Sequence, residues 1–133
     1  MWSWESDIVV VSKSDLIAEY EIKVSISDYK RDFKKRKHQF LKYNSVHSGP
    51  SRFIYALPGS LAEKASKIEI PDHAGLYLVH RYQIQVIKKP PLLHKQKITD
   101  HQVKKLFRSL HYKAWDSMNT LTQYRIAKGM QKK

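Results

Sequence analysis

The chain has 133 residues, with 25 lysines and arginines against 12 aspartates and glutamates, a formal net charge of +13 and no cysteine. This length suits one domain with one core. The lack of cysteine excludes disulfides, thiolate metal ligands and a cysteine nucleophile. The clustered positive charge favours nucleic acid as the partner over an acidic protein or an anionic membrane.

The location of the protein is expected to be intracellular. No apolar run approaches the roughly 20 residues that span a bilayer. Residues 1–5 lack the basic-then-apolar pattern of a secretory signal. We therefore expect a soluble, unprocessed cytoplasmic protein.

Two strands joined by a short turn are expected first. Residues 7–12 are rich in valine, which suits a strand buried on both faces. Residues 16–25 alternate, so their side chains divide between two faces. One face carries Ile17, Glu19, Glu21, Lys23 and Ser25, and the other carries Leu16, Ala18, Tyr20, Ile22 and Val24. The second, apolar set is predicted to face the core.

A basic helix is predicted next, with Ser27 or Asp28 as its N-cap and its end near Tyr43. Tyr29, Phe33 and Phe40 form its apolar stripe. The residues predicted to bind the phosphate backbone of a nucleic acid are Lys30, Arg31, Lys34, Lys35, Lys37 and His38. A solvated helix face is the alternative. Asp28 and Asp32 are explained by capping and by pairing with nearby lysines.

The remaining elements complete a single α/β domain over residues 1–122. Strands are predicted at 52–57, 76–80 and 82–87, with a short helix at 61–66. A final helix opens with the capping-box pattern Thr99-Asp100-His101-Gln102. The predicted order is β-β-α-β-α-β-β-α, followed by a basic, frayed tail at 123–133.

The charged face of the second strand is the candidate catalytic site. Asp7, at the start of the first strand, and Glu21 could hold Mg²⁺ or Mn²⁺, since Mg²⁺ needs only one or two carboxylates besides substrate oxygens and water. Lys23 could orient the attacking water or stabilise charge at phosphorus, and Glu19 could serve a second metal or hold a water. The alternative is a strand face charged for solubility.

These residues resemble a known family. Asp7 followed by Glu21-Ile22-Lys23 has the form of the PD-(D/E)xK nuclease motif, in a β-β-α context like that superfamily's core. The segments 21–25, 27–29, 53–58 and 70–76, together with Asp32, are most similar to the MmcB-like branch of DNA-repair endonucleases and related phage proteins.

The resemblance implies a restriction-endonuclease-like mixed central sheet flanked by helices. It also implies metal-dependent DNA cleavage, with Asp7 and Glu21 as ligands and Lys23 as the catalytic lysine. Such folds usually begin with a helix that carries another acidic residue, and only six residues precede Asp7. Glu5 or a partner subunit could supply that acid, and a homodimer is a further option.

Two other readings stay open from the sequence. One is a catalytically inactive nuclease-fold module that binds DNA or serves assembly, and the other is a factor whose basic surface meets an acidic protein. Zinc is not expected, because the seven histidines show no paired spacing. The four glycines lie too far apart for a phosphate-binding loop, which excludes nucleotide hydrolysis of that kind.

Overall fold

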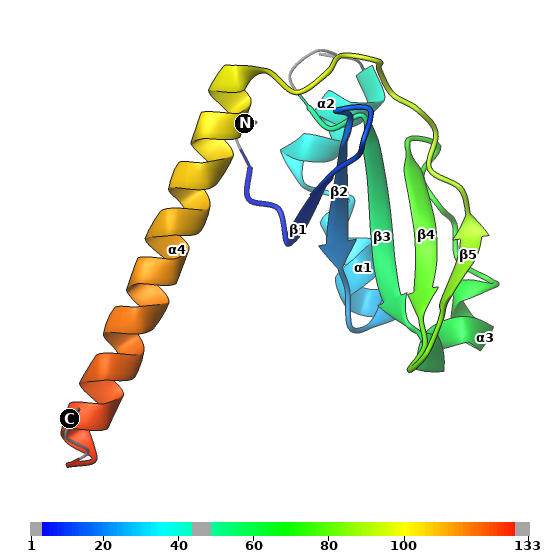
Figure 1. Cartoon of the computed structure of the whole chain (residues 1–133). Coiled ribbons are helices and arrows are strands. Elements are labelled where there is room, and N and C mark those ends of the chain that lie inside the picture. Colours follow the sequence, from blue (N-terminus) through cyan, green and yellow to red (C-terminus); the bar gives the residue numbers. More distant parts are fainter. Residues whose placement is uncertain (1–3, 44–48, 130–133) are drawn as a thin grey trace. The chain divides into compact units, whose positions relative to one another are not determined.

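A five-stranded mixed sheet forms the centre of the fold in a computed structural model that describes residues 4–43 and 49–129. The strands β1 to β5 follow one another across the sheet in chain order (Figure 1). They are β1 (Ile8–Val11), β2 (Ile17–Ile22), β3 (Arg52–Pro58), β4 (Ala74–Val79) and β5 (Ile84–Lys88). The three central strands are parallel and both edge strands pair antiparallel. The predicted α/β class is therefore confirmed.

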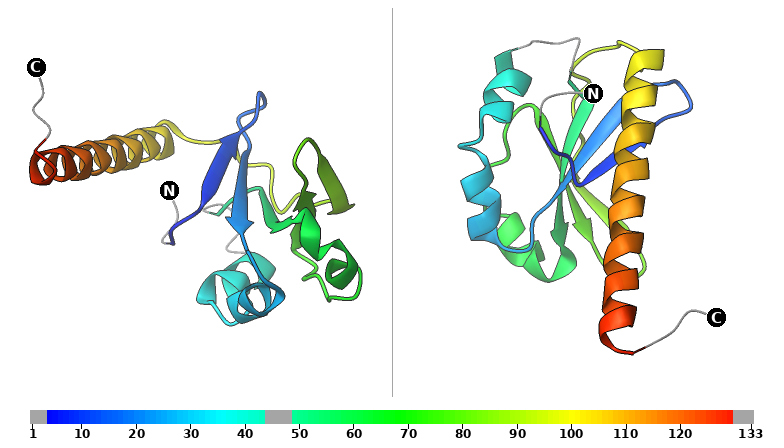
Figure 2. Two further views of the ribbon diagram at one scale, coloured as in Figure 1. Left: turned by 90° about the horizontal axis from the view of Figure 1, so that it is seen from below. Right: turned by 90° about the vertical axis from the view of Figure 1, so that its left-hand side faces the viewer.

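The helices that connect the parallel strands lie together on one face of the sheet (Figure 2). Helices α1 (Ile26–Asp32) and α2 (Arg36–Tyr43) link β2 to β3, and a 3-10 turn (Gly59–Leu61) and α3 (Ala62–Ala65) link β3 to β4. A parallel pair needs such a crossover, because a tight turn cannot return the chain to the start of the next strand.

The single helix predicted over residues 28–43 is wrong, because the structure has two helices there. The first begins earlier than predicted: the N-cap is Ser25, whose hydroxyl accepts a hydrogen bond from the Asp28 amide. It ends at Asp32, and residues 33–35 form a turn before α2. The side chain of Phe40, predicted for the apolar stripe, lies outside the described residues.

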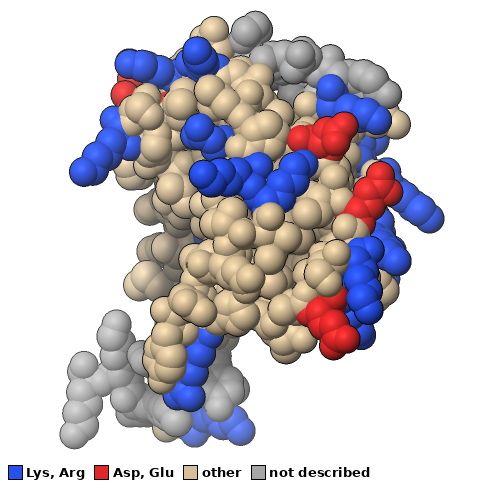
Figure 3. All heavy atoms as spheres, turned by 90° about the vertical axis from the view of Figure 1, so that its right-hand side faces the viewer, with Lys and Arg blue, Asp and Glu red and all other residues tan. Residues whose placement is uncertain are grey.

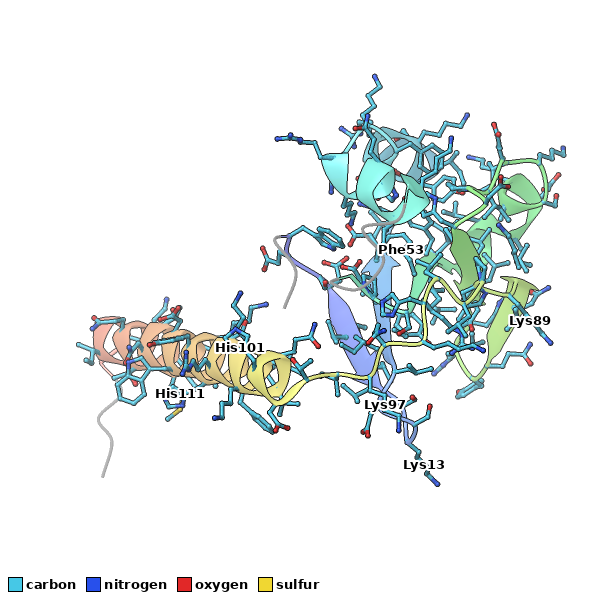
Figure 4. The ribbon with its side chains drawn as sticks, turned by 90° about the horizontal axis from the view of Figure 1, so that it is seen from above. Lys13, Phe53, Lys89, Lys97, His101 and His111 are labelled. Atoms are coloured by element: carbon cyan, nitrogen blue, oxygen red, sulfur yellow. The ribbon has the colours of Figure 1, made fainter. Side chains whose placement is uncertain are left out.

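The hydrophobic core fills the space between these helices and the sheet. Tyr29 of α1 packs with Phe53 and Tyr55 of β3 and with Leu76 and Leu78 of β4, and all five side chains are buried. Phe53 lies between its strand and the α1–α2 pair (Figure 4). The aromatic rings of Tyr29 and Tyr55 meet edge to face at 4.8 Å, a favoured arrangement.

The predictions for the first two strands are wrong in their burial. The strand β1 is an exposed edge strand, with Ile8 46% and Val10 44% exposed, rather than a strand buried on both faces. In β2 the helices cover the charged face, so Glu19 and Glu21 are buried. The apolar set predicted as core faces away from the helices, and Ile22 is 47% exposed.

Residues 99–129 form one compact unit, and the described residues up to Ile98 form another. The single domain expected over residues 1–122 stays a prediction. Helix α4 (Asp100–Ala127) fills most of the 99–129 unit and continues into the predicted tail. Its predicted capping box is confirmed, because the Thr99 amide donates to Gln102 Oε1 and the Gln102 amide donates to Thr99 Oγ1. Among the described helices, none has the length and apolarity to cross a membrane.

Candidate active site

A buried cluster of opposite charges lies where β2, α1 and α2 meet. Glu21, Lys23, Asp32 and Lys37 are each at most 6% exposed. The Lys23 Nζ lies 3.1 Å from Glu21 Oε1 and 3.0 Å from Asp32 Oδ1. One ammonium group therefore bridges a carboxylate of the sheet and a carboxylate of a helix. We call Glu21, Lys23, Asp32, Lys35 and Lys37 the charge cluster.

Two further lysines complete the charge cluster. The Lys37 Nζ lies 3.0 Å from Glu21 Oε2 and 3.9 Å from Asp32 Oδ2. The Lys35 Nζ lies 2.9 Å from Asp32 Oδ1 and 3.8 Å from Glu21 Oε1, and its side chain is half exposed. Burial alone would lower the pKa of Lys23, but the bonds to Asp32 and Glu21 raise it above its ordinary value. Lys23 is therefore charged at neutral pH.

The break between α1 and α2 explains how these lysines reach the same carboxylates. In an uninterrupted helix, residues 32 and 37 would be separated by about 140° around the axis and would face different sides. The turn at residues 33–35 re-aims the second helix, so that Lys37 points inward against Phe53, with its Nζ 5.1 Å from the ring centroid. The three lysines can then surround Asp32 and Glu21.

A chain of hydrogen bonds leads from Asp32 to two histidines. Asp32 Oδ2 lies 2.7 Å from the Tyr55 hydroxyl, which donates to it, and 2.6 Å from His38 Nε2. His38 Nδ1 in turn lies 3.0 Å from His73 Nε2. Burial alone would raise the pKa of Asp32, but bonds from His38, Lys35, Tyr55 and Lys23 hold it far below its ordinary value. Asp32 is thus ionised, and His38 Nε2 is the donor.

His73, the last residue in this series of hydrogen bonds, is held neutral. Burial, together with the nearby charges of His38, Lys88 and Lys42, lowers its pKa from 6.5 to about 4. Tyr55 shows the opposite shift: burial and its bond to the Asp32 carboxylate raise the pKa of its hydroxyl, so it remains a donor.

Asp7 lies at the edge of the sheet beside this cluster. Its Oδ2 accepts a hydrogen bond of 2.8 Å from the Ile22 amide, and the side chain is exposed. The register pairs Ile8 with Tyr20, and its continuation by one residue sets Asp7 across from Glu21. Within the described part of the chain, no ion pair or hydrogen bond joins Asp7 to Glu21 or Lys23. Their sharing of one metal stays a prediction.

The hydrogen-bond partners of Glu19 lie outside the charge cluster. Its carboxylate accepts hydrogen bonds from Trp4 Nε1, at 2.8 and 3.0 Å, and from the Ser6 hydroxyl. Burial raises its pKa although the bonds from Ser6 and Trp4 act in the opposite direction. These contacts tie the N-terminal segment to β2, so they do not support the predicted role of Glu19 at a second metal.

The residues predicted to bind the DNA backbone divide into two groups. Lys30, Arg31 and Lys34 are exposed, and Lys35 is half exposed, as such contacts require. The side chains of Lys37 and His38 are buried against Glu21 and Asp32, so their burial does not support the predicted contact with a DNA backbone. On the face in Figure 3, which looks onto the right-hand side of Figure 1, acidic and uncharged side chains separate the lysines and arginines.

The carboxylates present fit a magnesium ion better than a transition metal. Across residues 4–43 and 49–129 the structure has no group of three histidine, aspartate or glutamate side chains that could hold a metal. Mg²⁺ needs only one or two carboxylates and keeps several waters. Glu21 Oε2 is buried and, despite the nearby Lys37 ammonium, receives no hydrogen bond of ordinary geometry. Glu21, with Asp7 at the open edge, would hold such an ion.

Three residues of the site were missed from the sequence. Asp32 was predicted to pair with nearby lysines, which is correct, but not to be buried at the centre of the cluster. Alternation along β3 places Tyr55 on the same face as Phe53, and a buried tyrosine hydroxyl requires a partner, so Tyr55 could have been found. No pattern in the sequence singles out His73.

Comparison with known proteins gives the fold alone. No family model matches the chain, and no curated protein matches it. One solved structure is similar, described as the SPO1766 protein of unknown function from Silicibacter pomeroyi. The two chains are 19% identical with a TM-score of 0.54, and the match covers 88% of this chain and 70% of the other. The mixed α/β architecture is therefore shared with a protein whose own function is not known.

Proposed function

We propose that this protein is a restriction-endonuclease-like nuclease that hydrolyses phosphodiester bonds in DNA with the help of Mg²⁺. The observation that supports this most is the charged Lys23, buried between the carboxylates of Glu21 and Asp32. A buried ion-pair network is costly to build and adds little net stability, which favours a functional reason for it. The net charge of +13 matches a polyanionic substrate.

Each residue has a separate role in this proposal. Glu21 and Asp7 would hold the metal, which would supply Lewis-acid polarisation of the phosphate and activation of a water. The Lys23 ammonium stabilises the negative charge that develops at phosphorus. Asp32 contacts no substrate. It positions Lys23, because its Oδ1 lies 3.0 Å from the ammonium that also contacts Glu21.

The substrate backbone would meet the exposed lysines and arginine near α1. Lys30, Arg31 and Lys34 neutralise phosphates without reading sequence, so affinity from these contacts falls steeply with salt. The Lys35 side chain contacts Asp32 and is half exposed, so its ammonium can reach either Asp32 or a phosphate of the substrate.

A specific observation favours a second candidate, an inactive nuclease-fold module that binds DNA. Three ammonium groups already neutralise the two buried carboxylates of the charge cluster. A cation that approaches Glu21 therefore meets Lys23, Lys35 and Lys37 as well, and their repulsion opposes metal binding.

A cleavage assay separates the two candidates. The nuclease should nick supercoiled or branched DNA with Mg²⁺ or Mn²⁺, and Lys23→Ala should reduce the rate by about a hundredfold or more, by analogy with the loss of one charge-stabilising donor. Lys64→Ala is the matched control, since it removes an exposed lysine of α3 with no role in the proposal, and should keep most of the cleavage rate. Asp7→Asn should weaken Mn²⁺ binding measured without DNA.

The other outcomes are equally informative. Salt-sensitive DNA binding without cleavage, unchanged in Asp7→Asn, would identify the inactive module. No DNA binding at low salt would contradict both candidates and leave an acidic protein as the partner.

A further inference from the structure

A cavity of about 430 Å³ opens beside the charge cluster on the helix side of the sheet. One wall is formed by Phe33, His38, Gln39 and Lys42, and the other by residues 69–73, which precede β4. His38 belongs to both places, because its Nε2 contacts Asp32 while its ring lines the cavity. Two side chains, His38 and Asp32, therefore connect the cavity to Lys23.

The walls of this cavity combine flat rings with hydrogen-bonding groups. Phe33, His38 and His73 are aromatic, and Ile70 and Pro71 add apolar surface. The polar groups include the amide of Gln39. The volume lies within the range of pockets that bind small molecules. Aromatic and apolar walls with a few polar groups are the means by which proteins hold single, unstacked bases.

The charge of the cavity argues against a phosphate as its ligand. Glu69 and Asp72 contribute two carboxylates, against one ammonium from Lys42. His73 adds no positive charge at neutral pH, because burial lowers its pKa to about 4. The cavity therefore differs from the basic exterior of α1. Its acceptors suit a neutral ring that carries N–H donors, as nucleobases do.

The geometry points to a base-binding site: we propose that this cavity holds one unpaired nucleobase of a DNA strand whose phosphate lies at the charge cluster. This inference rests on the proposed function for the position of the phosphate. It further names the substrate class, because a base inside a duplex must leave the stack to enter such a cavity. Single-stranded or branched DNA should therefore bind better than intact duplex.

The test compares three DNA ligands in the absence of divalent metal, so that no cleavage can occur. The first is a short single strand that carries a fluorescent adenine analogue, the second is the same strand with abasic sites, and the third is the duplex. Stacking of one base on aromatic side chains should give the single strand about a tenfold advantage over the abasic strand. The emission of the analogue should fall on binding.

Two variants and one control locate the effect. Gln39→Trp fills the cavity from the exposed side of α2 and should abolish the tenfold preference, and His73→Ala should reduce it. Gln83→Trp makes the same substitution at an exposed position outside the cavity and should keep the preference. Gln39→Trp remains informative if His73→Ala fails to fold.

Equal binding of the base-containing and abasic strands would overturn the inference, as would an unchanged preference in Gln39→Trp. Because no metal is present, these results do not depend on catalysis. A base preference without any metal-dependent cleavage would keep the cavity and reject the nuclease. Cleavage without a base preference would support the nuclease and reject the base-binding site.

Discussion

The two faces of β2 reverse the usual relation between polarity and burial. On the face covered by α1 and α2, Glu19 is fully buried and Glu21 is 6% exposed. On the opposite face, Ile22 is 47% exposed, and with Ile8 and Tyr20 it lines a shallow apolar hollow. Charged residues are almost never buried unless they are paired. Glu21 is paired with lysines, and Glu19 accepts hydrogen bonds from Trp4 and Ser6. The sequence of the strand alone does not reveal these partners.

The difference between the faces shows where substitutions should affect stability most. Removal of one partner from a buried ion pair leaves an uncompensated charge in a region of low dielectric, whereas an exposed apolar side chain has little to lose. The charged face should therefore respond strongly to small changes and the apolar face weakly.

The largest effect is expected for Asp32→Ala. This change leaves the ammonium groups of Lys23 and Lys37 without one of their two carboxylates and the Tyr55 hydroxyl without its acceptor. The free energy of unfolding in urea should fall by about 3–5 kcal/mol.

Asp28→Ala is the control on the same helix, because its one ion pair, to Arg31, is exposed and 3.8 Å long. It should cost about 1 kcal/mol or less. Equal costs for the two variants would show that the charge cluster is not buried as described.

A pH dependence of stability is expected next, from His73. The pKa of this side chain is lowered from 6.5 to about 4 in the folded protein, so the unfolded chain takes up its proton first as the pH falls. The contribution of neutral His73 to the free energy of unfolding is fully present above pH 6.5. The free energy of unfolding should decrease by up to about 3 kcal/mol as the pH falls to about 4. Urea unfolding of His73→Gln should lack this decrease, and His80→Gln should retain it. Asp32 adds its own loss only below its ordinary pKa of 3.8, outside this window.

An intermediate effect is expected for the N-terminal segment. Trp4→Phe keeps a smaller aromatic ring but removes the Nε1 donor from the buried Glu19 carboxylate. A lost partner of a buried acceptor costs about 1–3 kcal/mol, which thermal unfolding can measure. Trp115→Phe removes the same donor from α4, where the side chain is 56% exposed, and should stay within about 0.5 kcal/mol. A Trp4 variant as stable as the Trp115 variant would mean that Ser6 alone satisfies Glu19.

The order of the elements could be predicted because it depends on local signals. Alternation, proline and capping patterns mark the strands and helices, and the capping box at Thr99 and Gln102 was found as predicted. The break after Asp32 could not be predicted, since no glycine or proline marks it. It follows from the tertiary contacts that draw Lys37 inward.

The burial of β2 and the partners in the site required the tertiary structure. Local pattern rules assign apolar residues to the core, and they fail in β2 because compensating lysines of Glu21 come from other parts of the chain, Lys35 from the turn and Lys37 from α2. Most partners of Asp32 lie near it in sequence, but Tyr55 on β3 is 23 residues away, so only the fold brings it to this carboxylate. Such conflicts between local pattern and fold concentrate at functional sites.

The smallest effect is expected on the apolar face, for Ile22→Thr. The Ile22 side chain is 47% exposed in a hollow that it shares with Ile8 and Val79. The change keeps the β-branched shape that suits a strand and removes little buried area, so it should alter the free energy of unfolding by about 0.5 kcal/mol or less. Urea unfolding at two protein concentrations measures this cost. A loss well above 1 kcal/mol that depends on concentration would mean that a second chain covers this face. In that event the apolar face of β2 would be an interface. One face of the strand would then be buried by the helices of its own chain and the other by a second chain.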